Sequence, residues 1–251
     1  MPNHCRRQRM KRINAHISRS LVLALLTLGF NVSDGLVLAG PFEDATAALV
    51  RDDYETARRL LRSLAENGDA AAQYELGLMF ENGVGISQDS KEAVRWYLLS
   101  AAQGYASAQY NLGGMYANGE GVNQDFNEAV RWYRLAGTQG YLSGQLILGA
   151  MYSAGLGVVQ DLTEAAKWYR LAATQGVAGA QSTLGQIYFN GNGVTQDFVR
   201  GHMWLSLAAA QGNNAAAQAR DIFSKKMTKL QLAKAKIMAI KCDLSNYKRC
   251  D

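Results

Sequence analysis

Hydrophobic, small and polar positions recur along this chain with a strict period of 36 residues, from about residue 54 to residue 197. Within each period, large apolar and small side chains lie three or four residues apart, and glycines interrupt the pattern at two fixed places. Such spacing is typical of short amphipathic helices that end in tight turns. A constant period of this length predicts an array of small helical units that bury their apolar faces against one another.

Each unit is predicted to contain two helices. The copies are residues 54–89, 90–125, 126–161 and 162–197, with a partial fifth copy at 198–221. Glycines suited to a left-handed C-cap end the first helix of each copy, at Gly68, Gly104, Gly140, Gly176 and Gly212. Paired glycines follow each second helix, starting at Gly83, Gly119, Gly155 and Gly191. We interpret the pairs as turns, because a phosphate-binding loop would follow a strand.

An acidic column stands at the start of the first helices. Its aspartates occupy the N-cap position, at Asp89, Asp125, Asp161 and Asp197, and three of them are followed three residues later by Glu92, Glu128 and Glu164. This spacing predicts a capping box, in which the aspartate and the glutamate each satisfy an unpaired backbone N–H group. The column is therefore interpreted as structural, and not as a set of catalytic or metal-binding carboxylates.

Large aromatic side chains and glycines are predicted to form the core. The tryptophans of the first helices are Trp96, Trp132, Trp168 and Trp204, and the glycines in the middle of the second helices are Gly77, Gly113, Gly149 and Gly185. A glycine in mid-helix costs about 1 kcal/mol relative to alanine. Its recurrence predicts that a neighbouring helix approaches closely there, beneath a tryptophan.

The repeated phrase resembles that of a known family. It reads A-x-x-W-Y-x-x-A-x-x-x-G, then A-Q-x-x-L-G-x-x-Y-x-x-G-x-G-V-x-x-D, over about residues 54–216. This is similar to the Sel-one-like repeat family, whose members are relatives of tetratricopeptide repeat proteins. The resemblance implies an all-α fold, a right-handed superhelical solenoid of four to five helix–turn–helix repeats. Residues 40–53 would form an N-terminal lead-in, and residues 222–251 a C-terminal capping helix and cysteine loop.

The first 39 residues are predicted to be an export signal. Six basic residues precede the apolar run from Leu21 to Phe30, and Val37-Leu38-Ala39 offers small residues for cleavage near Ala39. An uncleaved membrane anchor is the alternative, although the apolar run is about half of the roughly 20 residues that cross a bilayer. Met10 is an alternative start to Met1. We expect the protein to be periplasmic or secreted.

Removing the signal changes the charge of the chain. Of 26 basic and 21 acidic residues in total, six and one lie in residues 1–39, which leaves 20 of each. The net charge of +5 therefore does not indicate binding to nucleic acid. Residues 225–251 still hold eight basic and two acidic residues, a net of +6, which we interpret as a solvated helix face.

The remaining cysteines and histidine offer little chemistry. Cys242 and Cys250 are predicted to form a disulfide in an oxidising compartment. His202 is the one histidine beyond residue 39, and we interpret it as a surface or packing residue. The sequence predicts no metal, cofactor or catalytic residue.

The resemblance implies a scaffold that binds partner proteins on its concave face, as an adaptor or regulator in the cell envelope. The candidate contacts are on the first helices: arginines Arg62, Arg134 and Arg170, and tyrosines Tyr97, Tyr133 and Tyr169. Arginine and tyrosine are common anchors of interfaces. Alternatively, the tyrosines pack between helices and the arginines pair with the acidic caps of the next repeat.

A secreted enzyme is the rival hypothesis. Cysteine-rich members of the family have been associated with β-lactam binding and hydrolysis, but they carry cysteine pairs within their repeats. The repeats of this chain contain no cysteine, and no Ser/His/Asp or Ser/Lys set recurs at an interpretable spacing. We therefore expect no enzymatic activity.

Overall fold

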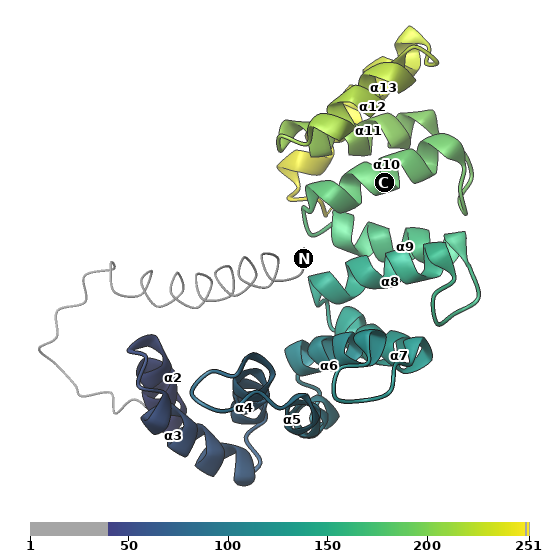
Figure 1. Ribbon diagram of the computed structural model, residues 1–251. Coiled ribbons are helices and arrows are strands. Elements are labelled where there is room, and N and C mark those ends of the chain that lie inside the picture. Colours follow the sequence, from purple (N-terminus) through teal and green to yellow (C-terminus); the bar gives the residue numbers. More distant parts are fainter. Residues whose placement is uncertain (1–39, 249, 251) are drawn as a thin grey trace, which may run out of the picture. The chain divides into compact units, whose positions relative to one another are not determined.

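The computed structural model describes residues 40–248 and residue 250, and this part of the chain consists of α-helices without any strand (Figure 1). The all-helical class predicted from the 36-residue period is thereby confirmed. The predicted export signal, residues 1–39, lies outside the described residues. The helices are α2 (Pro41–Val50), α3 (Tyr54–Glu66), α4 (Ala70–Asn82), α5 (Ser90–Ala102), α6 (Ala106–Asn118), α7 (Phe126–Thr138), α8 (Leu142–Ala154), α9 (Leu162–Ala173), α10 (Ala178–Asn190), α11 (Phe198–Ala210), α12 (Asn214–Ser224) and α13 (Lys229–Leu244).

The described residues divide into two compact units, one within residues 40–88 and the other from residue 89 onward. In the described part of the first unit, α3 packs against both α2 and α4. The lead-in predicted at residues 40–53 therefore contains a helix of its own. Small and apolar side chains on these helices, Ala45, Ala48, Ala57 and Leu61, are fully buried.

In the second unit, helices pair in chain order. The pairs are α5 with α6, α7 with α8, α9 with α10, and α11 with α12, and each of α6, α8 and α10 also packs against the first helix of the next pair. The last helix, α13, packs against α11. This nearest-neighbour packing is that of a repeat array, in which each unit is stabilised mainly by the units beside it.

The aspartate column caps the first helices as predicted, but the glutamates do not complete a capping box. The Asp125 carboxylate accepts hydrogen bonds from the backbone N–H groups of Asn127 and Glu128, at 2.8 and 3.1 Å. The Glu128 carboxylate turns outward to Arg131 at 2.9 Å. The backbone N–H of Asp125 donates instead to the carbonyl of Tyr116 on α6, at 2.9 Å. The predicted reciprocal bond is therefore wrong, because the preceding helix supplies the acceptor first.

The mid-helix glycines make room for the residue after each tryptophan, and not for the tryptophan itself. A Cβ atom on Gly113 would lie 2.8 Å from the ring of Tyr133, and one on Gly149 would lie 2.9 Å from the ring of Tyr169. Trp168 instead lies against Gly137 of the preceding first helix, where an added Cβ would meet its ring at 3.0 Å. The predicted close approach is present, with a different aromatic partner.

Buried glutamines connect neighbouring repeats. The Gln145 side chain is 3 % exposed, and its Nε2 donates to the carbonyl of Gly137 at the end of α7, at 3.0 Å. Its Oε1 accepts from Nε2 of Gln175 in the next repeat, at 2.8 Å. The same two bonds recur at Gln109 and at Gln181. Because a buried amide must be hydrogen-bonded, this glutamine ladder fixes how each repeat sits on the next.

Candidate functional site

Three first helices of the second unit, α5, α7 and α9, each expose a leucine three residues after the tryptophan. These side chains, the leucine column, are Leu99, Leu135 and Leu171, with 44 %, 41 % and 46 % of their surface exposed. Single exposed leucines are ordinary on a protein surface. Three at the same place in successive repeats form an ordered apolar line that the second unit presents to solvent.

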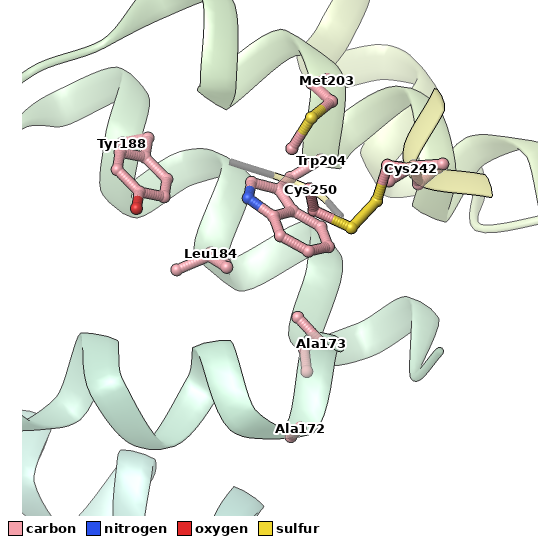
Figure 2. Close-up of a cluster of buried hydrophobic side chains, with 10 residues drawn as sticks. Ala172, Ala173, Leu184, Tyr188, Met203, Trp204, Cys242 and Cys250 are labelled. Carbon is pink, nitrogen blue, oxygen red and sulfur yellow. A yellow bond between two sulfur atoms is a disulfide. The ribbon is translucent and has the colours of Figure 1, made fainter. Parts of the chain in front are cut away.

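The fourth member of the column, on α11, is covered by another helix of the same chain. Leu207 on α11 stands 36 residues after Leu171, but it is only 4 % exposed. It belongs to a buried cluster with Met203, Cys242 and Cys250, shown in Figure 2, and α13 packs against this helix. The structure joins Cys242 to Cys250 in a disulfide, with a Cα–Cα distance of 4.5 Å. In the last repeat, the chain therefore covers the column with its own C-terminal helix.

The residue one helical turn before each leucine is charged in α5, α7 and α9 but apolar in α11, the helix against which α13 packs. Arg95, Arg131 and Lys167 are exposed at one position of the first helices, whereas Met203 at the equivalent position of α11 is fully buried. The charged residues form ion pairs within their own helices, at 3.3 Å to Glu92, 2.9 Å to Glu128 and 2.7 Å to Glu164. Exposed pairs of this kind contribute about 0–1 kcal/mol each, so they can exchange partners at little cost.

Two of the predicted contact arginines are held by tyrosines of the following helix. The guanidinium of Arg134 donates a hydrogen bond to the Tyr152 hydroxyl, and that of Arg170 donates to the Tyr188 hydroxyl. Each guanidinium carbon also lies within 6 Å of the same ring, at 5.9 and 5.6 Å. Among the described residues, Arg134 therefore pairs with a tyrosine and not with the acidic cap of the next repeat. Both arginines remain exposed on the surface.

The third predicted arginine, Arg62 on α3, lies in the first unit. Its Nε donates to Oε1 of Glu66 at 2.9 Å, one helical turn along the same helix. The equivalent position of α5 holds Leu98, which is 38 % exposed.

Two of the three tyrosines predicted as surface contacts are core residues instead. Tyr97 is fully buried and Tyr133 is 3 % exposed, while Tyr169 is partly buried against Gly149. Burial, with a smaller contribution from Tyr110, raises the pKa of the Tyr133 hydroxyl. Side chains without accessible surface cannot contact a partner, and the partner-binding hypothesis for Tyr97 and Tyr133 is therefore corrected to a packing role.

The leucine column was missed by the sequence reasoning. Its signal was available as a leucine recurring every 36 residues in four copies. Periodicity alone, however, makes a recurring leucine look like core, and only the packing of the helices shows that three of the four face solvent.

His202 on α11 is buried among charged neighbours. Its Nδ1 lies 3.3 Å from the Ser206 hydroxyl, and burial lowers the pKa of the imidazole, with Arg220 and Lys236 acting in the same direction and Asp221 opposing. No group of three metal-binding side chains occurs within residues 40–248 and 250. In the same part of the chain, no helix has the length and hydrophobicity needed to span a bilayer.

Comparisons with known proteins agree on one family. The model of the Sel1 repeat matches residues 47–69, 70–105, 106–141, 142–177 and 178–213. A Sel1 repeat protein from Oxalobacter formigenes has a solved structure 32% identical to this chain, with a TM-score of 0.68, covering 71% of this chain and 74% of the other. No curated protein matches the chain.

A second solved structure is that of a protective antigen present in uropathogenic Escherichia coli strains, described as displaying an SLR fold. It is 45% identical, with a TM-score of 0.60, over 63% of this chain. This chain spans only about a third, 34%, of that protein's length.

Proposed function

The chain belongs to the Sel1 repeat family, and on that premise we propose that it is an exported, non-catalytic scaffold that binds partner proteins along the exposed face of its first helices. Members of this family typically mediate protein–protein interaction. We propose that the protein acts in the cell envelope, as an adaptor or regulator of the proteins it binds.

The observation that carries this proposal is the leucine column and its covered fourth member. Leu207 is buried because α13 packs on its helix, whereas Leu99, Leu135 and Leu171 keep the same position open. Apolar surface at the centre of an interface contributes roughly 25 cal/mol per Å² when it is removed from water. A partner segment laid along the column would gain this burial, as α13 does in the last repeat.

Arg134 and Arg170 extend the proposed contact beside the leucines. A free arginine loses side-chain entropy when it is fixed by a partner, on the order of 1 kcal/mol. Because Tyr152 and Tyr188 already hold these guanidinium groups, part of that entropy is lost before binding. The pre-ordered donors then favour carboxylate or carbonyl groups of the partner. The exposed Glu–Arg and Glu–Lys pairs form the rim, where charge affects the association rate more than the affinity.

Export is supported by two features of the sequence and the fold. Residues 1–39 have the composition of an export signal. The Cys242–Cys250 disulfide lies within the core of the C-terminal cap, and such bonds persist in oxidising compartments.

Site-specific photocrosslinking in cells tests the proposal. A photoreactive residue placed at 135 or 171 should yield a discrete crosslinked product, whereas the same residue at 156 or 159 should not. Leu156 and Val159 are exposed apolar residues outside the column, at 46 % and 89 %, and serve as matched controls. Equal crosslinking at all four positions would contradict the assignment of the face.

Substitutions provide the second arm of the test. With the photoreactive residue placed at 99 instead, the double variant Leu135→Asp/Leu171→Asp, and separately Arg134→Ala/Arg170→Ala, should lose the crosslinked partner while the helical content stays unchanged. Leu156→Asp/Val159→Asp should retain it. Partner capture that survives both of the first two variants would remove the leucine column and the arginines from the binding surface.

A further inference from the structure

Helix α13 has a second apolar face that the cap does not use. Leu230, Ile237, Ile240 and Leu244 are 80 %, 53 %, 60 % and 83 % exposed, and Ala233 between them is exposed as well. They follow the spacing i, i+3, i+7, i+10, i+14 along the helix. This is the a/d pattern of a coiled-coil seam, maintained here over two heptads.

The seam lies on the side of α13 opposite the core. Ala235 and Cys242, seven residues apart, are fully buried, and Met238 and Ala239 beside them pack against the buried cluster. With 3.6 residues per turn, the five seam residues fall about half a turn away from Ala235 and Cys242. One face of α13 therefore packs against α11, and the other presents a narrow apolar line to solvent for about 21 Å.

Lysines border the seam on both sides. Lys234 and Lys241 occupy the e positions, and Lys229 and Lys236 occupy the g positions together with Asp243. With four lysines and one aspartate, α13 carries a net charge of +3. All four lysines are exposed, and none forms an ion pair with another of the described residues. The e and g positions of a coiled coil set partner choice through their charges.

We propose that this face of α13 is a docking surface for an acidic amphipathic helix, with apolar residues at its own a and d positions and glutamate or aspartate beside them. Charge complementarity selects this occupant. Such a partner would pair its carboxylates with lysines on both sides while the seam residues interlock. The surface is separate from the leucine column, so it adds a second binding mode to the scaffold.

A second copy of this chain does not fit the same face. Pairing two α13 helices in either direction would bring lysine opposite lysine at most e and g positions, and such like-charge contacts disfavour association. A membrane surface fits less well than a helix. An interfacial helix presents a broad apolar face with Trp or Phe, whereas the α13 seam is narrow and α13 contains no aromatic residue.

The face is formed before any partner binds. α13 begins with a complete capping box, in which the Thr228 side chain and the Gln231 side chain each satisfy a backbone N–H of the other residue. Near its C-terminal end, the disulfide and the burial of Cys242 attach the helix to the core (Figure 2). A helix that is already ordered loses little further entropy when a partner packs on it.

Titration with designed peptides tests the proposal on the whole chain. The probe is a helical peptide of about three heptads with leucine at a and d and glutamate at e and g, and its counterpart has lysine at e and g. The glutamate peptide should bind, measured by fluorescence anisotropy, and the lysine peptide should not. In the variant Lys234→Glu/Lys236→Glu/Lys241→Glu the preference should reverse. The affinity for the glutamate peptide should fall by at least about tenfold, and the lysine peptide should now bind.

The reversal distinguishes recognition from loss of fold, because a misfolded variant would not gain the lysine peptide. Lys91→Glu/Arg95→Glu/Lys167→Glu changes the net charge equally at exposed positions of α5 and α9 and should keep the original preference. Ile237→Ser/Ile240→Ser should weaken both peptides. Binding that ignores the charge reversal would overturn the proposal. The proposal would also be overturned if the protein bound phosphatidylglycerol vesicles but no peptide, or if it formed a dimer that Ile237→Ser/Ile240→Ser abolishes.

Discussion

Replacing a mid-helix glycine by alanine has two opposing effects on stability: a gain in helix propensity, and a cost where the new Cβ meets a neighbouring side chain. Gly113 and Gly114 are neighbours on α6, and alanine at either should gain about 1 kcal/mol from helix propensity. At Gly113 the new Cβ would lie 2.8 Å from two ring atoms of Tyr133 and 3.1 Å from a third. At Gly114 its nearest neighbour would be the Tyr133 hydroxyl oxygen, at an ordinary 3.6 Å.

The Tyr133 ring has little freedom to give way. It is 3 % exposed, and the ring of Tyr110 packs beside it with the two centroids 5.5 Å apart. Overpacking a filled core costs about 1–3 kcal/mol. Propensity cancels when the two variants are compared, so Gly113→Ala should be less stable than Gly114→Ala by about 1–3 kcal/mol.

Urea denaturation followed by far-UV circular dichroism measures this difference. Gly114→Ala should unfold at a higher urea concentration than the parent, and Gly113→Ala at a lower one. In a Tyr133→Ala background the Gly113→Ala change should become stabilising, because the ring it meets is gone. If Gly113→Ala proves as stable as Gly114→Ala, the close packing of Tyr133 on α6 is not what requires glycine.

Three further predictions address the caps, the histidine and the N-terminus. Asp125→Ala should lower the free energy of unfolding in urea by about 1 kcal/mol, because the Asp125 carboxylate caps α7. Glu128→Gln should change the same free energy by less than about 0.5 kcal/mol, because no capping bond is lost. Burial lowers the pKa of His202, so protonation of the imidazole favours the unfolded chain. The stability contributed by the neutral His202 side chain is present above the ordinary histidine pKa and is lost as the pH falls below that value. His202→Asn should therefore flatten the fall in melting temperature between about pH 7 and pH 5, and an unchanged slope would assign that fall to other groups. Intact-mass measurement of the native protein should show a chain that begins at Gly40, and a retained N-terminus would replace cleavage by a membrane anchor.

The sequence predicts the helices and turns well, because their signals are local. The aspartate caps and the positive-φ glycines each act on backbone groups within a few residues, so their spacing alone places the helix ends. Partners across helices are harder to predict. Tyr133 and Trp132 are adjacent in the chain, and only their directions from the helix decide which of them meets Gly113.

The candidate site was less accessible to sequence reasoning for a related reason. Leu171 and Leu207 occupy the same place in the period and have the same side chain, yet one faces solvent and the other is buried. The difference comes from α13, which begins 19 residues after the end of α11 and returns to pack against it. Nothing in the 36-residue pattern encodes where this last helix packs.

The glutamine ladder limits how such a chain can change in length. Each buried amide needs a carbonyl from its own repeat and a second glutamine that arrives 30 residues later. Inserting or deleting part of a repeat would leave amides in the core without acceptors or donors, at about 1–3 kcal/mol for each unpaired group. Adding or removing a whole 36-residue copy keeps every amide paired. Duplication and loss of complete repeats is therefore the route by which descendants of this gene can lengthen or shorten their array while the register between neighbours is preserved.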